Sequence, residues 1–256
     1  MPTSKRDVAA QAPDADHAAI PTPGPRVVVI TGATGALGRV AAAAFAADGA
    51  LLGLVGTDHA RLEALADELS LDDDRWAAGV GDLRRPAGAR TAMSAIDERF
   101  GRIDVLLHLV GGWTGGTAVA DLDPDVMDDM LGKHLWSTLH VTQAIAPGMT
   151  ERGWGRIVAV TSSATAAPGP KSSAYVVAKT AQETLLRVLA REVAGTGVTV
   201  NVVAVKAIDT AHARQTDPSP MNASWTSPEE IVAAMRYLCS DEAAAVNGAR
   251  IPLDGR

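Results

Sequence analysis

Short aliphatic runs alternate with helical patterns along almost the whole chain, and this alternation constrains the fold more than any other feature. Strands are expected at 26–30, 51–55, 77–80, 103–109, 156–161, 198–203 and 248–252. Helices are expected at 36–48, 58–69, 86–99, 125–150, 173–194 and 228–239. Strands that are apolar throughout suit burial on both faces, and alternating β and α elements predict a parallel sheet with helices on both sides. The expected fold is therefore a doubly wound α/β sheet of about seven strands.

The alternation begins at Arg26 and continues to residue 256 without a second linker, which predicts one domain over 26–256. Residues 1–25 are rich in Ala, Pro and Asp and contain few large apolar side chains. Such a segment buries too little surface to offset the entropy of ordering. We expect it to be a flexible extension.

Composition excludes several classes of protein. The formal net charge of −7 argues against a protein that grips nucleic acid, because phosphate binding needs clustered Lys and Arg. The chain has no apolar run long enough to span a membrane and no apolar signal core near Lys5 and Arg6. The single cysteine, Cys239, excludes an intrachain disulfide framework and a Cys-rich metal module. A cytoplasmic protein with a small-molecule substrate and no metal is the expectation.

A glycine-punctuated turn, Thr31–Gly38, follows the first expected strand and precedes the first helix. Its glycines at 32, 35 and 38 permit a tight turn and a close approach of backbone N–H groups to a pyrophosphate, next to the positive end of the helix. This placement favours a dinucleotide site over a plain structural turn. Candidate contacts from the turn are Gly32, Thr34, Gly35, Ala36, Leu37 and Gly38.

The residues after the second strand bear on the choice between NAD and NADP. An acidic residue there would bind a ribose 2′-hydroxyl and select NAD, but the strand ends in Gly56-Thr57. Asp58 comes late and equally suits a helix N-cap. The absence of an acidic residue favours NADP, although no Arg or Lys is present there to bind a 2′-phosphate. After the third strand, Asp82 is suited either to an adenine amino group or to capping a turn.

Tyr175 and Lys179 are four residues apart, and therefore share one face of the expected helix 173–194. Ser162 lies at the end of the strand before it, where parallel-sheet enzymes place chemistry. A charged Lys179 would lower the pKa of Tyr175, whose phenol could then exchange a proton with a carbonyl oxygen that Ser162 orients. Alone, a Tyr-x-x-x-Lys pair is more often an ordinary surface pair.

Taken together, these motifs resemble the short-chain dehydrogenase/reductase family over about residues 26–255. The ordered set comprises the glycine turn, Asp82, Gly111, Ser162, Tyr175, Lys179, Asn201–Thr210, Ser227-Pro-Glu-Glu, Leu238-Cys-Ser-Asp-Glu and Leu253-Asp254-Gly255. The resemblance implies a Rossmann-type fold and NAD(P)-dependent oxidoreduction. It implies Tyr175 as acid/base, Ser162 as the residue that orients the substrate, and Lys179 as a ligand of the nicotinamide ribose. The further cofactor contacts that it implies are Thr57, Asp82, Leu83, Val110, Gly111, Ile208 and Thr210.

Several positions depart from the family pattern. Ala36 replaces a glycine of the turn, His108-Leu109-Val110-Gly111 replaces Asn-Asn-Ala-Gly, and Val205-Lys206 replaces a Pro-Gly pair. His134 stands where the family has the Asn of a proton relay. It is either a replacement proton carrier or a hydrogen-bonded structural residue. Lys206 is expected either to bind a cofactor phosphate or to point into solvent, with neither alternative favoured.

Trp113 lies between two glycine pairs in Gly111–Gly116, a segment similar to one in dihydropteridine reductases, a divergent branch of the family. Its ring would either stack on a planar substrate such as a pterin or pack the loop onto the core. Retention of Ser162 favours ordinary carbonyl and alcohol chemistry, with pterin reduction as the alternative. A third hypothesis is a sensor or scaffold that binds NAD(P) without turnover. The polar segment 208–226 is expected to cover the substrate, and relatives commonly form dimers or tetramers through the helices matching 125–150 and 173–194.

Overall fold

The computed structural model describes residues 24–254, and its centre is one parallel sheet of seven strands in the order β3-β2-β1-β4-β5-β6-β7. The strands are β1 (Val27–Thr31), β2 (Leu51–Gly56), β3 (Trp76–Val80), β4 (Val105–His108), β5 (Gly155–Ser162), β6 (Val198–Val205) and β7 (Arg250–Leu253). The predicted doubly wound α/β fold is confirmed. The predicted extension, apart from Gly24 and Pro25, lies outside the described residues.

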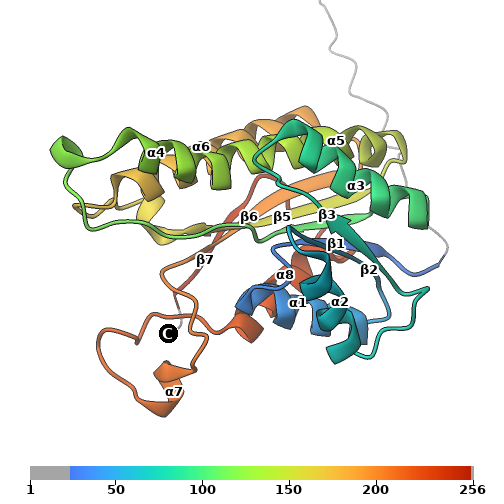
Figure 1. The fold of residues 1–256 in the computed structure, drawn as a ribbon, viewed down its shortest axis with the longest axis horizontal. Helices are drawn as coiled ribbons and strands as arrows, with labels where there is room; N and C mark the ends of the chain where they lie inside the picture. The colour runs from blue at the N-terminus through green and yellow to red at the C-terminus, as the bar shows by residue number, and fades with distance from the viewer. Residues whose placement is uncertain (1–23, 255–256) are drawn as a thin grey trace, which may run out of the picture.

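Helices cover both faces of the sheet (Figure 1). One layer holds α1 (Ala36–Ala47), α2 (His59–Glu68) and α8 (Pro228–Cys239), and the other holds α3 (Pro86–Phe100), α4 (Pro124–Leu131), α5 (Ser137–Glu151) and α6 (Ser173–Glu192). None of the helices within residues 24–254 is both long enough and apolar enough to cross a membrane.

The first strand shows how the sequence produces two cores. All five residues of β1 are buried, and successive side chains point to opposite faces of the sheet. Val28 and Ile30 join the core beneath α1 and α8, whereas Val27 and Val29 join the core beneath α3 and α5. An uninterrupted apolar run is therefore what this central strand requires.

The helix expected over 125–150 is interrupted in the structure. A π-helical turn, η2 (Gly132–Trp136), separates α4 from α5. Just beyond it, the Ser137 hydroxyl donates to the Lys133 carbonyl at 2.5 Å and the Thr138 hydroxyl donates to the His134 carbonyl at 2.5 Å. Hydroxyl groups that bond to a preceding carbonyl compete with the regular helical pattern, and π turns are frequent at functional sites. Here the turn places His134 beneath the cleft described below.

The segment 208–226 leaves the sheet after β6 and carries the short helix α7 (Ala213–Thr216), which stands out from the two layers in Figure 1. The Asp209 carboxylate accepts from the backbone N–H groups of Ala213 and Arg214 at 2.8 and 2.9 Å. A backbone bridge joins Ile208 to Thr226 and closes the excursion at its base. The segment is thus held by internal hydrogen bonds and by contacts of His212 and Arg214 with Glu229 and Glu230 of α8.

Candidate functional site

A cleft of about 540 Å³ opens at the carboxyl ends of the central strands, beside the switch in strand order between β1 and β4. Open parallel sheets bind ligands at such a switch, because the two connections there leave to opposite faces. The cleft is lined by the glycine turn, by the segment after β4, by His134, by Tyr175 and Lys179 of α6, and by the residues after β6.

The glycine turn has the shape that a dinucleotide requires. Gly32 has φ +71°, and a Cβ built on it would lie 3.2 Å from the backbone of Leu109. A Cβ on Gly38 would lie 2.3 Å from the Gly32 carbonyl oxygen. Gly35 caps α1 without a side-chain acceptor, and the first turn of the helix carries no acidic residue. The first N–H groups of α1 therefore have no side-chain partner at the cap, as a phosphate site at a helix N-terminus requires.

Gly38→Ala tests this close packing. We expect the added methyl group to force the turn open and to weaken NAD(P)H binding by about 100-fold or more, a cost of roughly 3 kcal/mol. The matched control is Gly148→Ala in α5, where the new Cβ would meet only the movable end of Arg152, at 3.1 Å. Fluorescence titration with reduced cofactor measures both variants, and equal affinity in the two would contradict the assignment of the turn.

Tyr175 and Ser162 come together between α6 and the end of β5. Burial of the phenol raises the pKa of Tyr175, and a hydrogen bond with the Ser162 side chain lowers that pKa in part. The Ser162 hydroxyl also accepts from the Ala164 backbone N–H at 3.2 Å. The expected lowering of the Tyr175 pKa by Lys179 is not seen, because burial outweighs the single lowering contact, which comes from Ser162.

Lys179 is almost completely buried at the floor of the cleft. Its ammonium group donates to the Val160 carbonyl and to the side-chain oxygen of Gln182, each at 2.9 Å. Burial lowers the pKa of Lys179 to about 7, against a smaller raising effect of Glu183. The amine is therefore poised between its charged and neutral forms near neutral pH.

His134 lies fully buried in the π turn, and its ring meets that of Tyr175 edge to face at 5.5 Å between centroids. Its Nε2 donates to the Gly112 carbonyl at 3.0 Å, while Nδ1 has no hydrogen-bond partner. Burial, assisted by the charge of Lys179, lowers the pKa of His134 to about 3. In this state the imidazole is neutral at pH 7.

A second buried histidine, His108, was not predicted as part of the site. Its Nδ1 lies 2.9 Å from the Thr31 hydroxyl and its Nε2 lies 3.3 Å from the Ser137 hydroxyl. These contacts join the ends of β1 and β4 to the start of α5. Burial lowers the pKa of His108 to about 3.

These two histidines predict an acid-sensitive fold. Their folded-state pKa values lie below the unfolded value, so the unfolded chain binds more protons between about pH 3 and 6.5. Stability is therefore fully present above pH 6.5 and falls as the pH drops, by up to about 1.4 kcal/mol per pH unit for each histidine.

Urea unfolding at pH 6.5, 5.5 and 4.5 measures this slope. We expect His134→Asn to flatten it, whatever its effect on stability at pH 7, and exposed His59→Asn to leave it as in the wild type. Equal slopes in the wild type and His134→Asn would show that His134 is not held neutral.

The cleft brings together most of the residues that the sequence predicts for the site. Its lining includes Gly32, Gly35, Ala36, Leu37, Gly38, Val110, Gly111, Trp113, His134, Tyr175, Lys179 and Ile208. Other predicted residues lie on segments around it rather than in its lining: Thr34, Thr57, Asp82, Leu83, Ser162 and Thr210. The lining also includes Lys206, whose ammonium group donates to the Ser224 hydroxyl at 3.0 Å.

Two aspartates considered for the cofactor have protein partners. Asp58 caps α2 by accepting from the Arg61 N–H at 3.3 Å. The carboxylate of Asp82 accepts from the Arg84 backbone N–H at 3.0 Å and from the Arg84 guanidinium at 2.9 and 3.0 Å. The hydrogen bond from the Arg84 side chain is the main reason that the pKa of Asp82 is lowered.

Comparisons with known proteins agree with this geometry. The family model for the short chain dehydrogenases matches residues 26–220. The chain belongs to this family. It is 30% identical over 239 residues to the D-threitol dehydrogenase of Mycolicibacterium smegmatis, covering 90% of this chain and 92% of that protein. It is 33% identical over 251 residues to the oxidoreductase UcpA of Escherichia coli K12, covering 90% and 93%.

Solved structures of the family superpose on this one. A short chain dehydrogenase from Bacillus anthracis has a TM-score of 0.80 at 30% identity, covering 90% of this chain and 95% of that one. Levodione reductase has a TM-score of 0.80 at 28% identity, covering 90% and 96%. The protein is thus an oxidoreductase of a family that uses NAD(P), and the residues of the cleft fit such a cofactor.

Trp113 lies at the mouth of the short-chain dehydrogenase cleft with 68% of its surface exposed. A Cβ on Gly115 would lie 2.7 Å from its ring, so the small residues beside it allow the indole to lie against the loop backbone. The exposed ring is not packed onto the core in this structure. The side chain is one of those that line the cleft.

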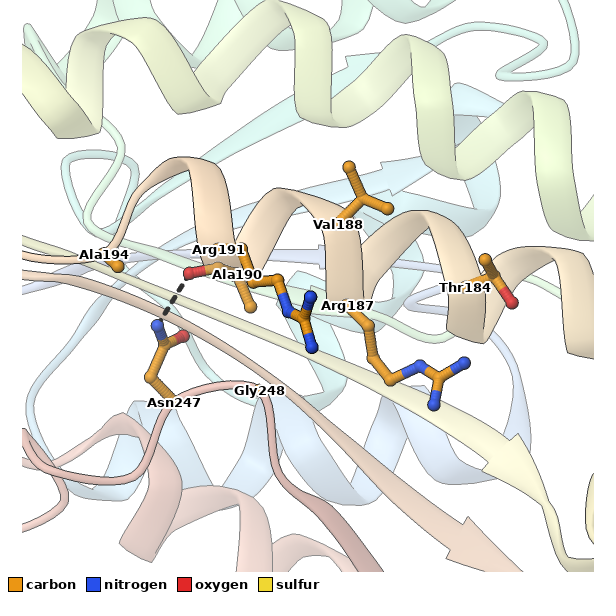
Figure 2. Close-up of a pocket in the computed structure, with 8 residues that line it drawn as sticks. All are labelled: Thr184, Arg187, Val188, Ala190, Arg191, Ala194, Asn247 and Gly248. Carbon is orange, nitrogen blue, oxygen red and sulfur yellow. Dashed lines mark hydrogen bonds between the residues drawn. The ribbon is translucent and has the colours of Figure 1, made fainter.

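A second groove of about 530 Å³ lies on the outer side of α6 (Figure 2). Arg187 and Arg191 of α6 extend along it, and Asn247 bonds to the Ala190 carbonyl at 2.7 Å. The Asn247 side chain also accepts from the N–H of Val200, near the start of β6, which places the groove towards the amino ends of the strands. Its lining has no carboxylate, tyrosine or histidine, and the described residues contain no cluster of potential metal ligands.

Proposed function

We propose that this protein transfers a hydride between NAD(P) and the carbonyl or alcohol carbon of a small molecule, with Tyr175 as the acid/base. The observation that carries the proposal is that Tyr175 and Lys179 line the same cleft as the glycine turn, with the Ser162 side chain hydrogen-bonded to Tyr175. Rossmann-type sheets bind a dinucleotide across the crevice at such a switch in strand order.

Each of the three side chains has a distinct part. The phenol of Tyr175 donates a proton to the carbonyl oxygen during reduction and accepts it from the alcohol in the reverse direction. The Ser162 hydroxyl bonds to the same oxygen and holds it beside the phenol. Lys179 binds the ribose next to the nicotinamide, and its charge favours the ionised phenol. The nicotinamide, when bound, supplies or takes the hydride.

Reduced cofactor carrying deuterium at C4 tests the proposal. Incubation with a panel of ketones, ketoacyl thioesters and sugar ketones should give an alcohol with deuterium on the former carbonyl carbon, and oxidation of the cofactor follows reduction of a quinonoid dihydropterin tested beside them. Transfer to the dihydropterin alone would instead support the pterin hypothesis. Tight cofactor binding without transfer to any member of a broad panel would favour a sensor or scaffold.

We propose NADP(H) as the preferred cofactor, because the end of β2 offers no free acid to a ribose 2′-hydroxyl. Thr57 is exposed there, and Asp58 serves as the cap of α2. Thr57→Asp adds a carboxylate that repels a 2′-phosphate and accepts from a 2′-hydroxyl. We expect its ratio of NADPH to NADH affinity to fall by about tenfold or more, with Thr57→Ser as the control. An unchanged ratio would place the adenosine ribose elsewhere.

We also propose that Trp113, which lines the cleft, contacts the substrate.

A separate proposal is that copies of the chain associate through the face formed by α5 and α6. Trp136, Val177 and Val188 lie exposed on or beside these helices, at 46%, 48% and 48%. Covering such exposed apolar side chains with a second copy of the chain would favour association. Light scattering that gives the mass of a monomer at micromolar concentration would contradict this association.

A further inference from the structure

Gln182 is buried one turn beyond Lys179 on α6, with 1% of its surface exposed. Residues three apart on a helix share a face, and the Gln182 side-chain oxygen accepts from the Lys179 ammonium at 2.9 Å. A buried amide normally satisfies all its polar atoms, since each unpaired one is costly. A glutamine at this buried position therefore needs a donor for its side-chain oxygen and an acceptor for its side-chain nitrogen.

The nitrogen of the Gln182 amide continues this series of hydrogen bonds towards the π turn. The Gln182 nitrogen donates to the Thr138 hydroxyl at 2.9 Å, and that hydroxyl donates to the His134 carbonyl at 2.5 Å. Each group in the series has one defined direction of donation. The Thr138 hydroxyl gives its proton to the His134 carbonyl and therefore accepts from the amide nitrogen, which leaves the amide oxygen facing the Lys179 ammonium.

The charged and titratable groups around Lys179 come from three elements. Tyr175 and Glu183 lie on the same helix, His134 lies on the π turn, and His108 lies at the end of β4. Both histidines are held neutral by burial, and the Glu183 carboxylate also bonds to the Thr161 hydroxyl at 2.6 Å. Gln182 is thus the neutral side chain that bonds directly to the ammonium.

We propose that Gln182 is a positioning residue that holds the ammonium group of Lys179 in place and stabilises its charged form, with Thr138 orienting the amide. With the Val160 carbonyl and Gln182 as acceptors, two ammonium hydrogens are engaged. The third is left for a ligand in the cleft. The consequence for catalysis rests on the proposed function, whereas the hold on Lys179 does not.

The chain has five lysines, so NMR of protein labelled with carbon-13 at the lysine ε position can follow each ammonium through a pH titration. Lys179→Arg assigns the Lys179 signal. Gln182→Met keeps the volume and removes the acceptor, and should lower the pKa of Lys179 by about one unit or more. Gln182→Glu supplies a carboxylate and should raise it. Leu186→Val, buried one turn further along α6, should leave it unchanged while lowering stability.

Opposite shifts in the two Gln182 variants, with none in Leu186→Val, would support the proposal, because a merely structural role would not reverse in sign. An unchanged Lys179 titration in Gln182→Met, or shifts in one direction in both variants, would overturn it. The same samples titrated with NADH and NADPH test the proposed function separately. If the wild type binds neither cofactor, the proposed function fails while the NMR titration still decides the role of Gln182.

Discussion

Tyr175→Phe is expected to lower turnover roughly 10³-fold while leaving cofactor affinity nearly unchanged. The variant removes one oxygen atom, and with it the proton that the carbonyl oxygen needs when the hydride arrives. The ring remains, so the edge-to-face contact with His134 and the shape of the cleft are preserved. Steady-state kinetics gives the first quantity, and fluorescence titration with reduced cofactor gives the second.

The chain supplies its own control for this variant. Tyr237, the other tyrosine, is 51% exposed on α8. Tyr237→Phe should therefore behave as the wild type in both measurements. Turnover in Tyr175→Phe within about tenfold of the wild type would show that the Tyr175 phenol is not the proton donor. It would leave a cofactor-binding protein whose proton donor lies elsewhere.

Lys179→Met is expected to lower kcat/KM about 100-fold and cofactor affinity about tenfold at pH 6.5. Methionine fills a similar volume but offers no donor to a ribose hydroxyl and no charge to the phenolate. In the wild type, cofactor affinity should fall as the pH rises through about 7, where the buried ammonium of the ligand-free protein loses its proton. The variant should lack this pH dependence.

Binding isotherms from pH 6 to 9 measure this difference. Lys171→Met is the matched control, because Lys171 is exposed and does not line the cleft. It should keep the wild-type profile. If Lys179→Met binds the cofactor with wild-type affinity and the same pH profile, the ammonium makes no contact with the ribose.

Much of the architecture is predictable because local patterns determine it. The apolar run at 27–31 is suitable only for a strand buried on both faces, and the glycines at 32, 35 and 38 are suited to the close turn that follows it. Lys179 follows Tyr175 by four residues, so any helix there brings the two side chains to one face. Each of these inferences needs only neighbours in sequence, and the structure places the three glycines, Tyr175 and Lys179 along one cleft.

Other features depend on contacts between distant segments. The π turn at 132–136 comes with hydrogen bonds from the Ser137 and Thr138 hydroxyls to its carbonyls, which no periodicity in the sequence indicates. His108 contacts Ser137 across 29 residues of sequence, and Gln182 contacts Thr138 across 44. The rise in the pKa of Tyr175 likewise follows from burial, which spacing along a helix does not reveal. A polar residue at a core position, such as Gln182, is the one signal in the sequence that points to such a network.

Parallel titrations of the wild type with NADH and NADPH show whether the cleft binds a nicotinamide dinucleotide. We expect saturable binding of at least one reduced cofactor, strongly weakened in Gly38→Ala and retained in Tyr175→Phe and Gly148→Ala. A difference of tenfold or more between the two cofactors, about 1.4 kcal/mol, would also settle the preference. Absence of binding by either cofactor, or binding that Gly38→Ala does not weaken, would contradict the assignment of the cleft as a nicotinamide dinucleotide site.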